Sequence, residues 1–284
     1  MLSVLTDRQW LWLAGAFYLT GFFMGTKWLK SGGCPLRTMG YGFLAVGYVV
    51  QLAGLYLRGQ AVGACPLGNK FEILQFTAWA AISLYLVVGV TFRSSLFGNL
   101  TSLLGAVLTL LSLAVPRWDA TRQPHLFGGN VWIEFHAALA LFSYGVFALL
   151  ALTSAMFLFR HYSLKSKQPG GWFAFLPSIL DLDQIGVRLL GTGVALLALS
   201  LAIGSVYWVR DTSSVNAAKL LVTVAVWVAY ALALLLRVRG RLLAKRFAGA
   251  CIVLFACALL SLGPVDASRH TLAPAIHLSD GSAP

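Results

Sequence analysis

The side chains able to do chemistry in this sequence are few, and they lie at the ends of long apolar runs. The ionisable residues at or inside such runs are Glu72, Glu134, His136, Asp183, Arg188 and Lys219, and two histidines, His270 and His277, follow the last run. Because a charged group inside an apolar segment of membrane-spanning length is costly, each of these residues is a candidate functional residue. The four cysteines show neither a C-x-x-C nor a C-x-x-C-H spacing, so the sequence encodes no zinc site and no covalent attachment motif.

His136 is the most informative of these residues. It stands early in the run WIEFHAALALFSYG and is followed by an almost wholly apolar stretch. Its imidazole must therefore bond to Glu134, to backbone, or to a metal. A packing role and a ligand role are both open at this point. A neutral imidazole can serve as an axial ligand of haem iron, and His270, or alternatively His277, would then supply the second ligand.

The elements that must position these residues are membrane helices. Of the 284 residues, 59% are apolar and 11% are charged, and the mean hydropathy is +0.81. Soluble domains have about 45–50% apolar and about 25% charged residues, so a water-soluble domain is excluded. Eight apolar runs are long enough to cross a bilayer as helices. They cover residues 9–29, 38–57, 71–92, 97–115, 131–159, 183–209, 217–236 and 246–263.

We therefore expect an all-α polytopic membrane protein, a bundle of about eight transmembrane helices. Residues 1–263 would form a single transmembrane domain, and residues 264–284 a polar and flexible tail. The net charge of +12 would favour a nucleic-acid partner in a soluble protein. Here most of the basic residues fall in loops, where they act as topology anchors and contact membrane lipids, so no nucleic-acid partner is expected.

The distribution of Lys and Arg predicts the orientation of the bundle. The loops after the first, third, fifth and seventh runs hold twelve of these residues, and the opposite side holds seven, among them Arg58. The more basic side is the cytoplasmic one, so both termini should face outward, into the periplasm in a bacterial inner membrane. Glu72, Glu134, His136, Lys219 and His270 would then all lie at the outer face.

Three stretches resemble the cytochrome c assembly family, the CcsA/CcmC/HemX-like membrane proteins. Pro66, Asn69, Glu72, Phe76 and Trp79 match the element P-x-x-N-x-x-E-x-x-x-F-x-x-W. His136, Ser143 and Tyr144 resemble the helix H-x-S-x-x-x-x-S-Y, which carries an outward-facing haem-ligand histidine in that family, although Ala138 replaces the first serine. Residues 176–230, with Lys219 and Trp227, resemble the last third of the family. The resemblance covers roughly residues 38–263.

The departures from the family pattern point to its reduced HemX/YpjD-type branch. Residues 209–218 replace the Trp-rich W-x-W-D-P-K-E loop, whose tryptophans would stack on a porphyrin. Gln51 occupies a place in the second run where haem-channel members often have histidine. The second outer histidine of the family has no G-L-H-S-Y segment here, and only His270 follows the last run.

The resemblance implies a non-enzymatic protein of cytochrome c biogenesis that binds or passes haem b at its outer face. His136 and His270 would ligate the iron, and Lys219, Glu72 and Trp227 would shape the pocket. A membrane partner protein of the same machinery would supply the apocytochrome, because no catalytic nucleophile with a positioned base is apparent. The alternative is a membrane scaffold or regulatory subunit that has lost haem binding and docks a partner through basic loops. A third hypothesis is a small-solute transporter. It is the least favoured, because the sequence shows no pair of interrupted membrane spans at corresponding positions.

Overall fold

The computed structural model describes residues 5–31, 35–88, 95–120, 130–166, 177–210 and 217–270, and every regular element within these ranges is a helix. The elements are α1 (Asp7–Ser31), α2 (Pro35–Val62), α3 (Lys70–Val88), α4 (Ser95–Ala114), the short 3-10 helix η2 (Pro116–Asp119), α5 (Val131–Lys165), α6 (Ile179–Arg210), α7 (Ala217–Val238) and α8 (Ala244–His270). Each of the eight predicted runs is a helix. The bounds differ most in α2, α5 and α8, which continue past their expected ends.

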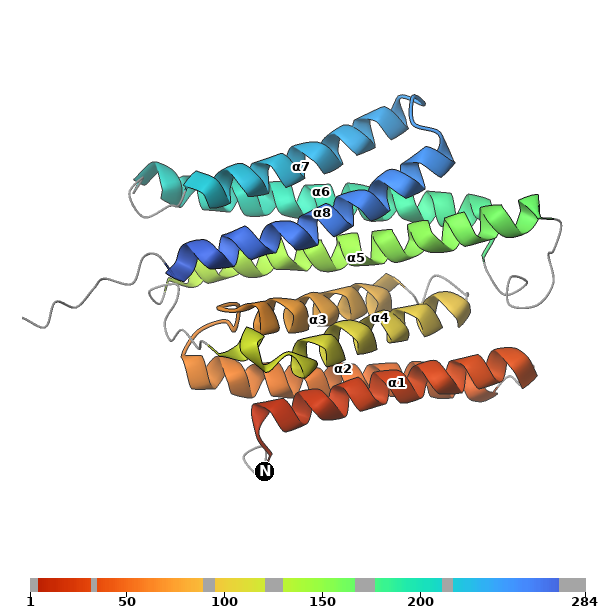
Figure 1. The fold of residues 1–284 in the computed structure, drawn as a ribbon, viewed down its shortest axis with the longest axis horizontal. Coiled ribbons are helices and arrows are strands. Elements are labelled where there is room, and N and C mark those ends of the chain that lie inside the picture. Colours follow the sequence, from red (N-terminus) through yellow and green to blue (C-terminus); the bar gives the residue numbers. More distant parts are fainter. Residues whose placement is uncertain are drawn as a thin grey trace, which may run out of the picture.

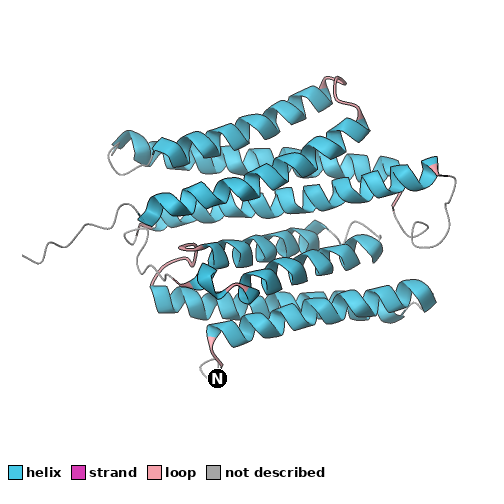
Figure 2. Ribbon diagram, viewed as in Figure 1, coloured by secondary structure: helices cyan, strands magenta, loops and turns pink. Residues whose placement is uncertain are grey.

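The eight long helices run along the long axis of the molecule and alternate in direction (Figure 1). Helices α1–α4 form one half and α5–α8 the other, and the halves meet mainly where α3 packs on α5. Between helices, the described connections are loops and turns (Figure 2). We call the end at which α1, α3, α5 and α7 begin the N-terminal end of the bundle. Of the candidate residues, Glu72, Glu134, His136, Lys219 and His270 lie near this end, whereas Asp183 and Arg188 lie near the start of α6 at the other end, where Asp183 pairs with Arg237 of α7.

Length and composition identify the chain as a multi-pass membrane protein. Among the described residues, five helices are long and apolar enough to cross a membrane: α2, α4, α5, α6 and α7. The other three long helices, α1, α3 and α8, lie alongside them and carry more polar residues toward their ends, such as Lys70 and Glu72 in α3. The fold is therefore the predicted all-α polytopic bundle.

Close contact between the two halves depends on Gly145 of α5. A Cβ atom built at this position would lie 2.6 Å from the Cβ of Ala80 and 2.8 Å from the backbone nitrogen of Ala81, both in α3. Small residues let membrane helices approach closely enough for extensive van der Waals contact. The neighbouring Phe147 is fully buried and stacks on Tyr230 of α7, with 3.8 Å between ring centroids. The α3–α5 contact therefore has no room for a larger side chain at Gly145.

Replacing Gly145 by leucine should separate α3 from α5. We expect a loss of about 1–3 kcal/mol of stability, the usual cost of overpacking a tight contact. Thermal unfolding of the detergent-purified protein measures it. Gly191→Leu in α6 is the matched control, because a Cβ at Gly191 would meet nothing within 4 Å. Equal destabilisation by both variants would show that the α3–α5 contact is not the tight one.

Candidate functional site

A buried arginine organises the N-terminal end of the α1–α4 half. Arg58, near the end of α2, has no exposed surface and is the largest fully buried side chain in the described residues. Its Nε donates to Glu72 Oε1 at 2.7 Å, and its Nη1 donates to Asp7 Oδ2 at 2.9 Å. Its Nη2 pairs with Asp119 Oδ1, and its Cζ lies 4.7 Å from the ring centroid of Phe71. The guanidinium thus joins α1, α2, α3 and η2.

A second arginine shares this cluster. Arg8 of α1 donates from Nη1 to Asp119 Oδ2 at 3.0 Å and from Nη2 to the carbonyl of Leu113 at 3.3 Å. Three carboxylates thus face two guanidinium groups. Arg58 was expected to be a loop anchor on the outer side, and that expectation is wrong, because its side chain points into the bundle and is saturated by carboxylates. The only sequence feature that could have indicated a buried Arg58 is its position directly after an apolar run. Nothing in the sequence around Asp7 or Asp119 indicates that they pair with it.

Glu72 belongs to this cluster and also begins α3. Its backbone N–H donates to Asn69 Oδ1 at 2.9 Å, and its Oε2 accepts from the N–H of Gly68 at 2.6 Å. This reciprocal arrangement is close to a capping box, which satisfies N–H groups left free at a helix start. Glu72 therefore caps the start of α3 and also pairs with Arg58. Both carboxylate oxygens are therefore engaged, one by Arg58 and one by the backbone of Gly68.

His136 is held between α5 and α6. Its Nδ1 lies 2.6 Å from the carbonyl oxygen of Ser200, and Ser200 Oγ donates to the carbonyl of His136 at 2.9 Å. Gly204, one turn further along α6, makes room for the ring, because a Cβ there would lie 2.7 Å from His136 Cε1. Of the two protein partners considered from sequence, Glu134 and backbone, backbone is the one observed. Glu134 turns to the opposite face of α5 and accepts from the N–H of Cys65 at 3.2 Å.

This contact selects the tautomer of the neutral imidazole. A carbonyl oxygen only accepts hydrogen bonds, so we assign the ring proton to Nδ1, which leaves the lone pair on Nε2. Among the described residues, Nε2 has no hydrogen-bond partner. Histidines that ligate metals through Nε2 typically donate their Nδ1–H to a carbonyl or carboxylate in this way. The geometry of His136 therefore fits a ligand as well as a packing residue.

The surface beside His136 is apolar and exposed. Trp132 precedes His136 by one helical turn, so both lie on the same side of α5, and Trp132 is 60% exposed. Phe135 and Val131 in the same turn are 50% and 75% exposed. An exposed indole one turn from an imidazole with a free nitrogen can stack on a flat apolar ligand.

The structure brings only some of the predicted site residues together. Trp227 donates its Nε1 to the carbonyl of Val194 at 3.3 Å, which is roughly 9 Å deeper along α6 than Ser200. Lys219 lies in the first turn of α7 and His270 is the last residue of α8, both at the N-terminal end. Nothing is described of their side chains, and His277 lies outside the described residues.

A metal ion held by several side chains has no candidate site in the described ranges. No group of three or more His, Cys, Asp or Glu residues there could hold one. Haem iron differs, because the porphyrin supplies the equatorial ligands and the protein adds only axial ones. Gln51 is not available as such a ligand, because its amide is bonded to Tyr18, Gln75 and Thr109. Among the described side chains at the N-terminal end of the bundle, His136 is the histidine that could serve as an axial ligand.

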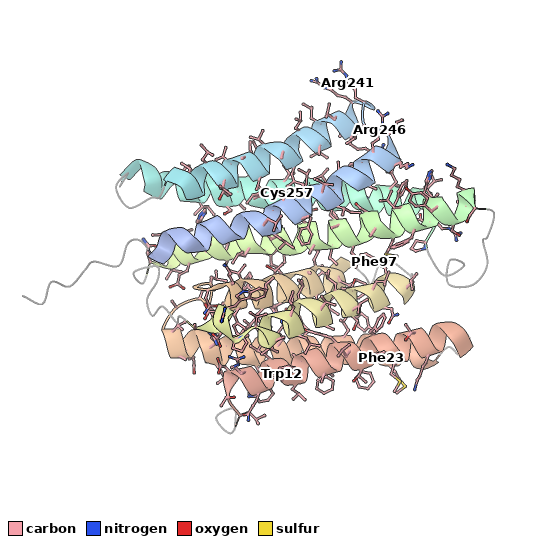
Figure 3. The ribbon with its side chains drawn as sticks, in the orientation of Figure 1. Trp12, Phe23, Phe97, Arg241, Arg246 and Cys257 are labelled. Carbon is pink, nitrogen blue, oxygen red and sulfur yellow. The ribbon has the colours of Figure 1, made fainter. Side chains whose placement is uncertain are left out.

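Removing the charge of Arg58 should be strongly destabilising. Arg58→Met leaves the buried carboxylates of Glu72 and Asp119 without their main partner, and we expect a loss of about 3–5 kcal/mol. Thermal unfolding in detergent measures this loss. Arg241→Met is the control, because Arg241 is exposed and points away from the bundle at the opposite end (Figure 3). Similar stability of the two variants would contradict the role of Arg58.

Comparison with known proteins places the chain in context. It is 27% identical over 191 residues to the protein HemX of Brevibacillus brevis, which covers 67% of each chain. It is also 27% identical over 172 residues to the protein HemX of Bacillus subtilis, covering 60% of this chain and 61% of that one. The cytochrome c biogenesis protein CcsA of Chlamydomonas reinhardtii is 28% identical over 187 residues, covering 63% of this chain and half of CcsA.

The family match covers most of the bundle. The family model described as cytochrome C assembly protein matches residues 67–264. The resemblance seen in the sequence covered roughly residues 38–263. The family match ends close to residue 263 but begins later than residue 38. It includes the capped start of α3, His136 and Ser200, and it leaves out α1 and the whole of α2, including Arg58. Because the match covers well over half of the sequence, the chain belongs to the cytochrome c assembly protein family.

Proposed function

We propose that this protein acts in cytochrome c biogenesis by binding or passing haem b at the N-terminal end of its bundle, with His136 as an axial ligand. The observation that carries the proposal is the imidazole held at Nδ1 by the Ser200 carbonyl, which leaves Nε2 free beside an exposed tryptophan. Membership of the cytochrome c assembly family supports it, as does similarity to CcsA.

The second ligand in this proposal is His270, with His277 as the alternative. Helix α8 packs on α5, and it ends at the same end of the bundle where α5 begins (Figure 1). The backbone of α7 brings Lys219 to this end as well. A lysine there would pair with a haem propionate. When bound, haem would supply the redox-active iron, and the chain would hold and orient it.

The protein would act without catalysing the covalent step itself. Attachment of haem to a cytochrome requires cysteines of the apocytochrome, so a membrane partner from the same machinery would present that chain. The bundle would lie in a bacterial inner membrane, in contact with its lipids, with both termini on the periplasmic side. The burial of Arg58 supports this orientation, because it removes one basic residue from the outward side and sharpens the Lys/Arg asymmetry.

A second candidate function is a scaffold or regulatory subunit that has lost haem binding. The hairpin between α7 and α8 favours it, because exposed basic residues are concentrated there. They are Arg239, Arg241, Lys245 and Arg246, and Figure 3 shows Arg241 and Arg246 at the tip and flank of this hairpin. Such a surface would dock an acidic partner on the cytoplasmic side. A haem-binding measurement separates the two functions.

Replacing His136 by alanine should abolish or shift the Soret band of the haem-loaded, detergent-purified protein. Added imidazole should restore the band, because it fills the vacated axial position. His161→Ala is the matched control, since His161 lies on the same helix near its other end, stacked on Phe157. We expect the control to leave the spectrum unchanged. An intact Soret band in His136→Ala with a reduced yield would identify a packing histidine and favour the scaffold.

A second variant tests the same site without removing the ligand. A methyl group at Gly204 would clash with the imidazole and displace Nδ1 from the Ser200 carbonyl. Gly204→Ala should therefore weaken haem binding and shift the Soret band. Gly191→Ala, at an open position of the same helix, should do neither. If Gly204→Ala binds haem as the wild type does, the placement of His136 by α6 is irrelevant to the ligand.

The orientation is tested by reporter fusions. Alkaline phosphatase fused after residue 284 should be active, because the enzyme folds only outside the cytoplasm. The same reporter inserted in the hairpin at residues 239–243 should be inactive. The opposite pattern would place His136 and the whole N-terminal end of the bundle on the cytoplasmic side.

A further inference from the structure

Two lysines lie beside an exposed tyrosine where the end of α5 meets the start of α8, at the end of the bundle opposite His136. Lys245 of α8 places its Nζ 5.5 Å from the ring centroid of Tyr162 in α5. Lys165 follows Tyr162 by three residues, so it lies on the same side of α5, one turn closer to the helix end. All three side chains are exposed, and we call this group the lysine site.

The hairpin between α7 and α8 holds Lys245 in position. Arg237 closes the turn by donating from Nη1 to the carbonyl of Leu242 at 2.9 Å, and its Nη2 pairs with Asp183 of α6. Its Cζ lies 5.4 Å from the ring centroid of the buried Phe247, two residues after Lys245. The start of α8 is therefore fixed against α6 and α7, and Lys245 is presented to α5 from a braced backbone.

Neither lysine of the site has a carboxylate partner among the described residues. Two described carboxylates lie at this end of the bundle, and both are already engaged. Asp183 is paired with Arg237, and Asp181 accepts from Ser178 Oγ at 2.6 Å. Two cations beside one ring repel each other, so an anion from outside the chain would stabilise the arrangement.

The surface next to the lysine site, toward the middle of the bundle, is apolar. Phe159, one turn before Tyr162 on the same side of α5, is 63% exposed, and α5 is one of the helices able to cross the membrane. On α8 the line that starts at Lys245 continues through Gly249 to the exposed Ala256. A Cβ at Gly249 would meet nothing within 4 Å, so this strip of α8 is open. An acyl chain would fit beside Phe159.

Helix α7 sets the level of the lysine site in the bilayer. Its apolar span ends at Val238, which is 72% exposed, and only residues 239–243 separate α7 from α8. Lys245, in the first turn of α8, therefore lies in the headgroup region, which is about 5–7 Å thick on each side of the hydrocarbon layer. Lipid phosphates are the anions concentrated at this level. A water-soluble acidic partner would have to displace lipid from the neighbouring apolar side chains, so lipid is the favoured ligand.

We propose that the lysine site binds the headgroup of an anionic phospholipid of the phosphatidylglycerol type. The phosphate would lie between Lys165 and Lys245, Tyr162 Oη would donate to it, and an acyl chain would run over Phe159 and the open surface at Gly249. A zwitterionic headgroup carries its own cation, which the two ammonium groups repel, so net negative charge selects the lipid. The lysine site lies at the opposite end of the bundle from the proposed haem site and does not depend on haem binding.

The test is native mass spectrometry of the full chain in detergent, titrated with dioleoylphosphatidylglycerol or with dioleoylphosphatidylcholine. The first phosphatidylglycerol should bind at least about tenfold more tightly than the first phosphatidylcholine. Lys245→Gln should weaken phosphatidylglycerol binding about fivefold, the usual value of one basic residue beside an anionic lipid surface. Lys165→Gln should act similarly, and neither variant should change phosphatidylcholine binding.

Arg241→Gln is the matched control. It removes the same charge from the same hairpin, but Arg241 is exposed and points away from the bundle (Figure 3). It should leave phosphatidylglycerol affinity unchanged. Equal weakening by Arg241→Gln and Lys245→Gln would overturn the site and identify a diffuse attraction to the hairpin. Equal affinity for the two lipids would also overturn it, as would displacement of the lipid by an equal concentration of glycerol 1-phosphate, which would identify a site for soluble phosphates.

Discussion

A fully buried guanidinium is tolerable only where carboxylates surround it. Because Arg58 is fully buried, the N-terminal end of the α1–α4 half must bring carboxylates to it. Removing a cation from water costs several kcal/mol, which is recovered only with good geometry and several hydrogen bonds. Arg58 obtains them from Asp7, Glu72 and Asp119, which belong to α1, α3 and η2. The ends of these elements are therefore fixed relative to α2. The loop carrying Cys65 and the start of α3 are therefore held in place as well.

Below this cluster the α1–α4 half is joined by uncharged polar groups. Tyr18 donates to Gln51 at 2.8 Å, Gln51 donates to Gln75 at 2.8 Å, and Gln75 donates to Ser112 at 2.8 Å. One residue comes from each of α1, α2, α3 and α4, and all four are fully buried. Hydrogen bonds between membrane helices have few competitors, so such a chain favours one arrangement of the four helices. The α5–α8 half relies more on stacked rings and apolar packing.

The eight long helices could be predicted from the sequence because a membrane helix depends on local composition. A run of about 20 apolar residues has few stable structures in a membrane other than a helix, and all eight runs are helices. The site residues depend on which helices become neighbours, and no local pattern encodes that. His136 was identified from its isolation among apolar residues, but its partner Ser200 lies 64 residues away. Arg58 was misassigned for the same reason, since its partners Asp7 and Asp119 are 51 and 61 residues distant.

The two halves of the bundle thus offer different chemistry at one end. On the α5–α6 face, His136 has a fixed tautomer and a free Nε2 beside exposed Trp132, which suits a flat ligand with a metal centre. On the α2–α3 face, Phe76 and Trp79 line a hollow whose accessible surface is apolar and whose lining contains no charged side chain. The family's Trp-rich loop is missing between α6 and α7, so stacking on the histidine side would rest on Trp132. Because Trp132 and His136 share one helix face, their spacing is set by α5 alone and does not require that loop.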